Sequence, residues 1–303
     1  MRFWFCCERL HSLHPWRADW EVPASALVVM NGTLQHSAVY ILRPWDGHVQ
    51  SRAMPDQILS GKAALVTGGA RRIGRAIALA LARAGADVAI TYRKSPIDSS
   101  QTLEGIKSLG CRALAVECDV RSEDSVRSAI HAVTSIFGRL DVLVNNAAVF
   151  ETAPLESISL EQWDAVFETN ARGPFLVTRE ALPFLRKAQG RVVNIGSLGG
   201  IHPWAGHSHY CSSKAAVHML TQAMAKAFAP EVSVNCVAPG WIEMPDLADP
   251  KDGAAEIAER FAARTPVRRN GTAEDVAEAV LFFAAGSSFV TGQILTVDGG
   301  LGL

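Results

Sequence analysis

Short apolar segments alternate with longer helical segments from about residue 58 to the end of the chain. This alternation is the feature that most constrains the fold, because strands that alternate with helices form a parallel sheet covered on both faces. The apolar segments lack polar alternation, which fits strands that are buried on both sides. We expect seven strands: Ala63–Thr67, Asp87–Thr91, Ala113–Val116, Asp141–Asn145, Arg191–Ile195, Ser233–Val237 and Ile294–Val297. The predicted fold class is α/β, with a single doubly wound, Rossmann-like parallel sheet.

Helical signals between these strands support the same fold. Arg72–Ala84 repeats its apolar residues at helical spacing, and Gly85 follows where a helix-ending glycine is expected. Thr272 is followed three residues later by Asp275, a pattern that resembles a capping box. We therefore expect helices on both faces of the sheet.

The first 57 residues do not follow this pattern. They hold four of the seven tryptophans, and their apolar residues form no helical or strand-like face. We expect residues 1–57 to be a poorly structured extension and residues 58–303 to be the single folded domain. The extension either packs on the domain or a partner, or reflects a misassigned start with initiation at Met54. The missing periodicity favours the second interpretation.

Charge and cysteine content narrow the functional classes. The chain has 29 basic and 30 acidic side chains, a balance that argues against a nucleic-acid-binding surface. No run approaches the roughly 18–20 apolar residues that span a bilayer, and the amino terminus shows no targeting signal. The six cysteines form no CxxC pair. We therefore expect reduced thiols in a cytoplasmic protein, and no metal site.

A glycine-rich segment joins the first predicted strand to the first predicted helix, with the sequence Thr67-Gly68-Gly69-Ala70-Arg71-Arg72-Ile73-Gly74. Glycine lets a backbone turn tightly and approach a pyrophosphate, whose charge the amino terminus of the helix stabilises. Such a turn is weak evidence by itself, but its place at the first crossover favours a dinucleotide site. The candidate cofactor residues here are Thr67, Gly68, Arg71, Arg72, Ile73 and Gly74.

The end of the second predicted strand indicates which dinucleotide is bound. NAD sites usually place an acid there for the ribose 2′-hydroxyl, whereas this strand runs into Thr91-Tyr92-Arg93-Lys94-Ser95. Arg93 can pair with a 2′-phosphate that a carboxylate would repel. Arg71 and Arg72 add two cations on the neighbouring loop. The sequence therefore predicts NADP(H) as the cofactor.

Tyr210 and Lys214 lie four residues apart and share one face of a predicted helix. A free tyrosine has a pKa of about 10, and a nearby ammonium stabilises the phenolate and lowers that pKa. A Tyr-x-x-x-Lys pair is common by chance, so its position has to support any role. Ser197 stands at the end of the fifth predicted strand, thirteen residues before Tyr210. The pair is therefore a candidate acid–base centre.

Taken in order, these motifs resemble the short-chain dehydrogenase/reductase family over about residues 60–300. The family's serine-to-tyrosine interval matches Ser197 and Tyr210, and its catalytic asparagine matches Asn170. The resemblance implies that Ser197 hydrogen-bonds the substrate oxygen and that Tyr210 exchanges the proton. It also implies that Lys214 lowers the tyrosine pKa and contacts the nicotinamide ribose, and that Asn170 supports a water.

The same resemblance assigns further cofactor contacts. Asp119-Val120 matches the pair that contacts the adenine, and Asn146-Ala147 matches part of the family's Asn-Asn-Ala-Gly segment, with Ala148 in place of the glycine. The Pro-Gly turn that holds the nicotinamide side corresponds to Pro239, Gly240 and Ile242, with Met244 where threonine is frequent. Tyr210 and Lys214 are expected to touch the cofactor as well.

Three functions follow from the resemblance. The first is NADPH-dependent reduction of a 3-oxoacyl thioester or another ketone. The second is pteridine reduction, suggested by Arg72 in place of the usual middle glycine, although Ser197 stands where that branch commonly has aspartate. The third is a non-catalytic NADP(H)-sensing or scaffold protein. Substrate specificity is expected in Gly200–His209 and Trp241–Arg269.

The expected partner is a small-molecule carbonyl or alcohol substrate, with neither nucleic acid nor membrane involved. The family usually forms dimers or tetramers through long helices, which correspond here to Leu160–Lys187 and Tyr210–Ala229. The chain is therefore expected to be a homodimer or a homotetramer.

Overall fold

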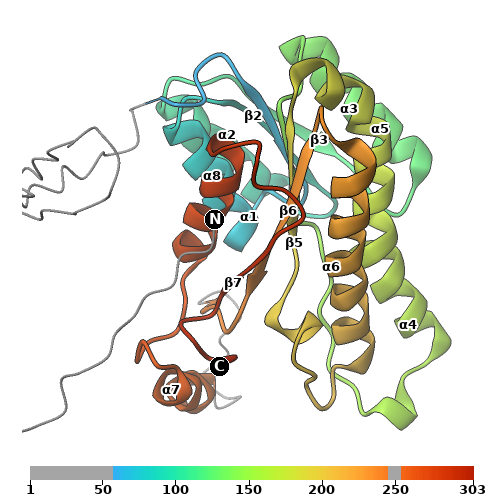
Figure 1. Cartoon of the computed structure of the whole chain (residues 1–303), viewed down its shortest axis with the longest axis vertical. Helices are drawn as coiled ribbons and strands as arrows, with labels where there is room; N and C mark the ends of the chain where they lie inside the picture. The colour runs from blue at the N-terminus through green and yellow to red at the C-terminus, as the bar shows by residue number, and fades with distance from the viewer. Residues whose placement is uncertain (1–56, 245–253) are drawn as a thin grey trace, which may run out of the picture. The chain divides into compact units, whose positions relative to one another are not determined.

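In the computed structural model, which describes residues 57–244 and 254–303, seven strands form one parallel sheet (Figure 1). Their order is β3-β2-β1-β4-β5-β6-β7, so the strand order reverses between β1 and β4. The predicted extension lies outside the described residues apart from Gln57. The strands are β1 (Ala63–Val66), β2 (Asp87–Tyr92), β3 (Ala113–Glu117), β4 (Val142–Asn145), β5 (Arg191–Ile195), β6 (Ser233–Pro239) and β7 (Ile294–Val297). The predicted fold class is confirmed.

The strands at the centre of the sheet are buried along their whole length. Leu65 in β1 lies opposite Ala89 on one side and Leu143 on the other, and every residue of β1 and β4 is buried. This burial on both faces explains why these segments are continuous apolar runs rather than alternating ones.

Helices cover both faces of the sheet (Figure 1). One core cluster joins the sheet to α1 (Arg72–Arg83), α2 (Pro96–Ser108) and α8 (Ala273–Ala285). The other joins it to α3 (Glu123–Phe137), α5 (Gly173–Ala188) and α6 (Ser208–Phe228). Two further helices are α4 (Leu160–Phe167) and α7 (Ala254–Arg264). Ligands in sheets of this kind bind at the carboxyl ends of the strands, where the strand order reverses.

The segment expected as one long helix, Leu160–Lys187, is interrupted. α4 passes into a π-helical turn over Glu168–Arg172, and α5 begins directly after it. Pro174 stands in the first turn of α5 and has no N–H to donate to the preceding helical turn, so the regular hydrogen-bond ladder cannot continue. The prediction of one regular helix was wrong here, and the interruption carries Asn170.

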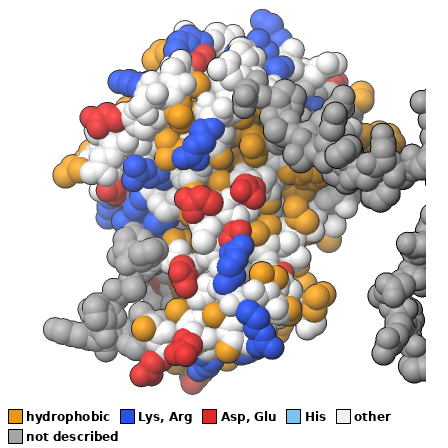
Figure 2. Space-filling view, turned by 90° about the vertical axis from the view of Figure 1, so that its left-hand side faces the viewer, with side chains coloured by type: hydrophobic (Ala, Val, Ile, Leu, Met, Phe, Trp, Pro, Cys, Tyr) orange, Lys and Arg blue, Asp and Glu red, His pale blue; other side chains and the backbone are white. Residues whose placement is uncertain are grey.

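Charges of both signs are interspersed on the face shown in Figure 2. Among the described residues drawn there, no continuous basic surface of the kind that nucleic acids require is visible. In the described parts of the chain, no helix has the length and apolar character to cross a bilayer.

Candidate active site

A cavity of about 380 Å³ opens at the carboxyl ends of β1, β2 and β4. We call it the cofactor cavity. Ten of the predicted cofactor residues line it: Gly68, Arg71, Arg72, Ile73, Gly74, Arg93, Asp119, Val120, Asn146 and Ala147. The sequence did not single out several other lining residues, among them Cys118 and Thr169. Cys118 follows β3, and Thr169 lies in the π-helical turn. No sequence motif marks either residue.

The glycine-rich loop is shaped so tightly that side chains are excluded at particular points. A Cβ at Gly74 would lie 2.2 Å from the carbonyl oxygen of Gly68 and 2.6 Å from Nδ2 of Asn146. Arg72 takes the left-handed backbone conformation, with φ 54°, although it carries a side chain. Glycine adopts that conformation at no steric cost, so the loop keeps a glycine-like backbone where the sequence has arginine.

Thr67 fastens this loop to the turn after β4. Its hydroxyl accepts hydrogen bonds from the N–H groups of Asn146, at 2.9 Å, and Ala147, at 3.0 Å. The Asn146 side chain donates in return to the carbonyls of Thr67 and Gly68, at 2.9 and 3.1 Å. Thr67 itself does not line the cavity. The structure therefore gives Thr67 and Asn146 a shared role in holding the two loops together.

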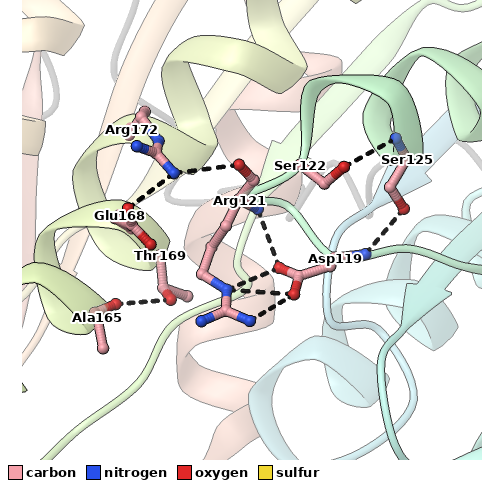
Figure 3. Close-up of polar contacts among 8 residues, drawn as sticks. All are labelled: Asp119, Arg121, Ser122, Ser125, Ala165, Glu168, Thr169 and Arg172. Atoms are coloured by element: carbon pink, nitrogen blue, oxygen red, sulfur yellow. Dashed lines mark hydrogen bonds and ion pairs between the residues drawn. The ribbon is translucent and has the colours of Figure 1, made fainter. Parts of the chain in front are cut away.

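The cationic edge of the cavity lies beside a paired carboxylate. Arg93 and Lys94 line the cofactor cavity and also a neighbouring hollow to which Glu117, Asp119 and Arg121 contribute. Arg121 grips Asp119 through Nε, 2.9 Å from Oδ1, and through Nη2, 2.6 Å from Oδ2 (Figure 3). This pairing lowers the pKa of Asp119 to about 2, mainly through the side-chain hydrogen bond from Arg121. The acid near the cationic edge is therefore neutralised by its own partner.

The same loop is tied to the π-helical turn. Arg172 donates to the backbone carbonyl of Arg121 at 3.2 Å and pairs with Glu168 at 3.0 Å (Figure 3). A Cβ at Gly173 would lie 2.9 Å from the side chain of Val120. The Asp119–Arg121 segment is therefore packed directly against the turn that holds Asn170.

Ser197, Tyr210 and Lys214 meet beside the end of β5. Ser197 follows β5, whereas Tyr210 and Lys214 project from the first turns of α6. Nζ of Lys214 lies 5.8 Å from the centre of the Tyr210 ring and donates to the carbonyl of Ile195 at 2.8 Å. The Ser197 side chain acts on the Tyr210 phenol in the direction that lowers its pKa. The structure brings these three predicted residues together, but none of them lines the cofactor cavity.

Burial controls the pKa values at this centre. It raises the pKa of Tyr210, and the Ser197 side chain opposes that rise only in part. It also lowers the pKa of the Lys214 ammonium to about 8. The expected lowering of the tyrosine pKa is therefore not found in this structure, because the cost of burying a phenolate outweighs the stabilisation from nearby groups.

Asn170 acts as a clamp on the loop after β4. Its Oδ1 accepts from the N–H of Val149 at 2.8 Å, and its Nδ2 donates to the carbonyl of the same residue at 2.9 Å. Nδ2 also donates to the Ser213 hydroxyl on α6 at 3.1 Å. Asn170 thus links the π-helical turn, the loop after β4 and the helix that carries Tyr210. Its support of a water stays a prediction.

His218 is a buried residue of the site that sequence reasoning missed. Its Nε2 accepts a long hydrogen bond, 3.4 Å, from the backbone N–H of Ser197. A Cβ at Gly196 would lie 2.3 Å from that nitrogen, so the ring packs directly against the backbone of Gly196 and Ser197, which we call the serine loop. Burial, together with the Lys214 charge, lowers the pKa of His218 to about 4. The one available signal was its spacing of four residues from Lys214 on α6.

The predicted Pro-Gly turn lies after β6, apart from the cofactor cavity. Gly240 donates its N–H to the carbonyl of Val297 at 3.0 Å, and a Cβ there would lie 2.6 Å from the side chain of Asp298. Ile242 forms a bridge with Gly271. None of the three predicted residues of this turn, Pro239, Gly240 and Ile242, lines the cavity. Met244 does line it.

Sequence comparisons find similarity to reductases that act on acyl-carrier-protein substrates. Residues 68–302 match the sequence profile of the family described as Enoyl-(Acyl carrier protein) reductase. The 3-oxoacyl-(acyl-carrier-protein) reductase FabG of Staphylococcus aureus strain Mu50 is 37% identical over 243 residues, which cover 79% of this chain and 98% of that protein. The protein of the same name from Thermotoga maritima is 38% identical over 247 residues, covering 80% and 98%.

Solved structures show the same similarity. A blue fluorescent protein from a metagenomic library, in complex with NADPH, has a TM-score of 0.75 at 35% identity, covering 81% of this chain and 99% of that one. A short chain dehydrogenase from Burkholderia cenocepacia J2315, in complex with NADP, has a TM-score of 0.74 at 40% identity, with the same coverage.

Proposed function

The chain belongs to the short-chain dehydrogenase/reductase family, and we propose that it uses NADPH to reduce a ketone to an alcohol. The observation that carries this proposal is the meeting of Ser197, Tyr210 and Lys214 at the end of β5, in the same sheet edge as the cofactor cavity. The 3-oxoacyl reductases among its relatives favour carbonyl reduction over pteridine reduction.

The residues of the cofactor cavity fit NADP(H). The Gly68–Gly74 loop leaves no room for a Cβ at Gly74, which suits close approach of a pyrophosphate. Arg93 and Lys94 give the cavity a cationic edge suited to a 2′-phosphate. Because Arg121 already pairs with Asp119, that acid does not cancel the edge. When bound, NADPH supplies the hydride that reduces the carbonyl carbon.

In the proposed mechanism, Ser197 donates a hydrogen bond to the substrate oxygen and holds it beside the Tyr210 phenol. Tyr210 gives its proton to that oxygen as the carbonyl group is reduced to an alcohol. The positive charge of Lys214 then favours the tyrosinate that remains, because opposite charges stabilise each other in a buried site. Asn170 positions the loop after β4 through its double hydrogen bond to Val149.

Replacing Tyr210 by phenylalanine tests this assignment. The Tyr210→Phe variant should lose at least about a hundredfold in kcat, because general acid catalysis contributes on that order. NADPH binding should stay close to that of the parent, since the ring and its packing remain. Oxidation of NADPH with acetoacetyl thioesters and simple ketones measures the first quantity, and cofactor fluorescence measures the second. Turnover by the variant near the parent rate would remove Tyr210 from the mechanism.

We also propose that the protein self-associates in the cytoplasm. Large apolar side chains are exposed on the helices expected to form the interface, including Leu160 on α4, Phe175 on α5 and Met219 on α6. Burial of this apolar surface against a second copy would be favourable. A homodimer or a homotetramer would cover it. The four cysteines in the described residues are free thiols, in keeping with a reducing compartment.

A further inference from the structure

Four rings, one of them the ring of Tyr210 itself, form a closed circuit of contacts. Phe150 meets Tyr210 edge to face, with ring centres 4.8 Å apart, and stacks on His207 at 4.7 Å. Trp204 lies 6.1 Å from His207 and nearly parallel to Tyr210 at 6.4 Å. All four distances fall within the range of favourable ring pairs. We call Phe150, Trp204, His207 and Tyr210 the aromatic collar.

The collar is held in place by backbone contacts between two loops. Ala153 donates its N–H to the carbonyl of Gly206 at 2.9 Å, and Nδ1 of His207 lies 3.1 Å from the carbonyl oxygen of Glu151. The double hydrogen bond from Asn170 fixes Val149, the residue before Phe150. A collar that is fixed in this way loses little conformational freedom when a substrate enters.

The collar also remains open to a ligand. Phe150 is 56% exposed although it touches Tyr210, and Trp204 and His207 are partly exposed. When a substrate covers a large aromatic side chain that is exposed to water, the burial of apolar surface stabilises the complex. Trp204 also lies close to the serine loop, because a Cβ at Gly199 would be 3.5 Å from its ring and 3.4 Å from Oγ of Ser197.

We propose that the physiological substrate is an aryl ketone, in which the carbonyl carbon is bonded directly to a planar aromatic ring. The inference rests on the proposed function, since the carbonyl oxygen must lie beside Tyr210 and Ser197. The group one bond away from the carbonyl carbon then lies among the rings of the collar. Aromatic rings gain from edge-to-face and stacked contacts beyond the area they bury, and saturated groups of the same size do not.

A matched pair of 3-oxo esters tests the inference with the full chain. Ethyl 3-oxo-3-phenylpropanoate and ethyl 3-cyclohexyl-3-oxopropanoate differ only in whether the six-membered ring is aromatic. Each kcat/KM is divided by the rate of chemical reduction of the same ester by borohydride, which removes the difference in intrinsic reactivity. The parent enzyme should prefer the phenyl ester by roughly tenfold, the factor that one or two ring contacts supply.

Two variants locate the source of that preference. Phe150→Leu and Trp204→Leu keep an apolar side chain but remove a ring, so each should lower kcat/KM for the phenyl ester by about tenfold and leave the cyclohexyl ester within about twofold. Phe289→Leu is the control, because Phe289 is 97% exposed and lies beyond α8. It should change neither value.

The possible results separate the inference from the function on which it rests. Equal normalised rates for the two esters in the parent enzyme, or a preference for cyclohexyl, would overturn the aryl substrate while ketone reduction stands. Parallel losses for both esters in the two collar variants would overturn it as well. No oxidation of NADPH with either ester or with acetoacetyl thioesters would overturn the proposed function, and the inference with it.

Discussion

His218 shows how much a single buried side chain can decide in this site. Only 6% of its surface is exposed, its Nε2 accepts from the Ser197 backbone, and the Lys214 ammonium lies near it. Protonation would remove the acceptor and place a second cation beside Lys214. The folded structure therefore favours the neutral form of the ring.

The consequence is a loss of stability in acid. The pKa of His218 falls from 6.5 to about 4 on folding. Between these pH values the unfolded chain binds a proton that the folded chain does not, so the free energy of unfolding decreases as the pH is lowered through this window. The total loss from this group is on the order of 3 kcal/mol.

A His218→Gln variant, which keeps a neutral hydrogen-bond acceptor, should show a shallower decline between pH 6.5 and 4 than the parent. Urea unfolding at several pH values measures the difference. His131→Gln, at an exposed histidine on α3, is the matched control and should follow the parent. Identical pH profiles for parent and His218→Gln would show that this histidine is not the cause.

At the residue scale, the sequence predicted properties that follow from residue identity and spacing. It did not predict properties that depend on the surroundings of a side chain in the fold. The Tyr210–Lys214 spacing and the cations at Arg93 and Lys94 could be read directly from the chain. The direction of the tyrosine pKa could not, because it depends on burial by residues distant in sequence. The pairing of Asp119 by Arg121 was equally hidden, although the two are only two residues apart.

At the scale of the element, the first turn of α1 packs so closely against the preceding loop that it requires glycine at position 74. Gly74 faces the carbonyl of Gly68 with no space for a methyl group. Gly68 belongs to the glycine-rich loop that lines the cofactor cavity, so a side chain at position 74 must push that loop outward.

We expect Gly74→Ala to weaken NADPH binding by at least tenfold and to lower stability by about 1–3 kcal/mol, the usual cost of forcing an extra group into a packed site. Arg75→Ala, at the next and exposed position of the same helix, should leave both quantities close to the parent. Cofactor fluorescence titration and thermal unfolding measure them. Unchanged affinity in Gly74→Ala would mean that the loop approaches the cofactor less closely than proposed.

Strand positions were predictable from the sequence, whereas helix interruptions were not. The fifth and seventh strands match their predicted bounds. The sixth strand ends at Pro239, two residues after the predicted end at Val237. In β1 and β4, burial on both faces leaves a continuous apolar run that is visible in the sequence. The π-helical turn had one local signal, the missing N–H of Pro174. The Arg172 bond to the Arg121 carbonyl, which also holds this turn, joins residues 51 positions apart and is not visible in the sequence.

At the scale of the molecule, residues 53–303 form one compact unit. The core clusters of the described residues begin at Leu59, close to the predicted domain start at residue 58. We therefore propose that the domain folds without the residues that precede Met54.

A chain that starts at Met54 should keep its melting temperature within about 2 °C, which corresponds to at most about 1 kcal/mol for a domain of this size. Its kcat/KM for ketone reduction should match that of the full chain, because every proposed site residue lies after Thr67 or at it. Thermal unfolding and steady-state kinetics of the two chains provide the comparison. A large drop in either quantity would assign a structural role to the first 53 residues.

The reversal of strand order between β1 and β4 has a thermodynamic consequence. Within the described sheet, this ladder is the one pairing that joins β1–β3 to β4–β7, and it spans three residue pairs. The cofactor cavity draws its walls from both halves, through Gly68 on one side and Asn146 on the other. A ligand that binds only the folded chain adds about 2.7 kcal/mol at a hundred times its Kd. We therefore expect NADPH to stabilise the folded chain as well as to supply the hydride, because it would hold the two halves of the sheet together.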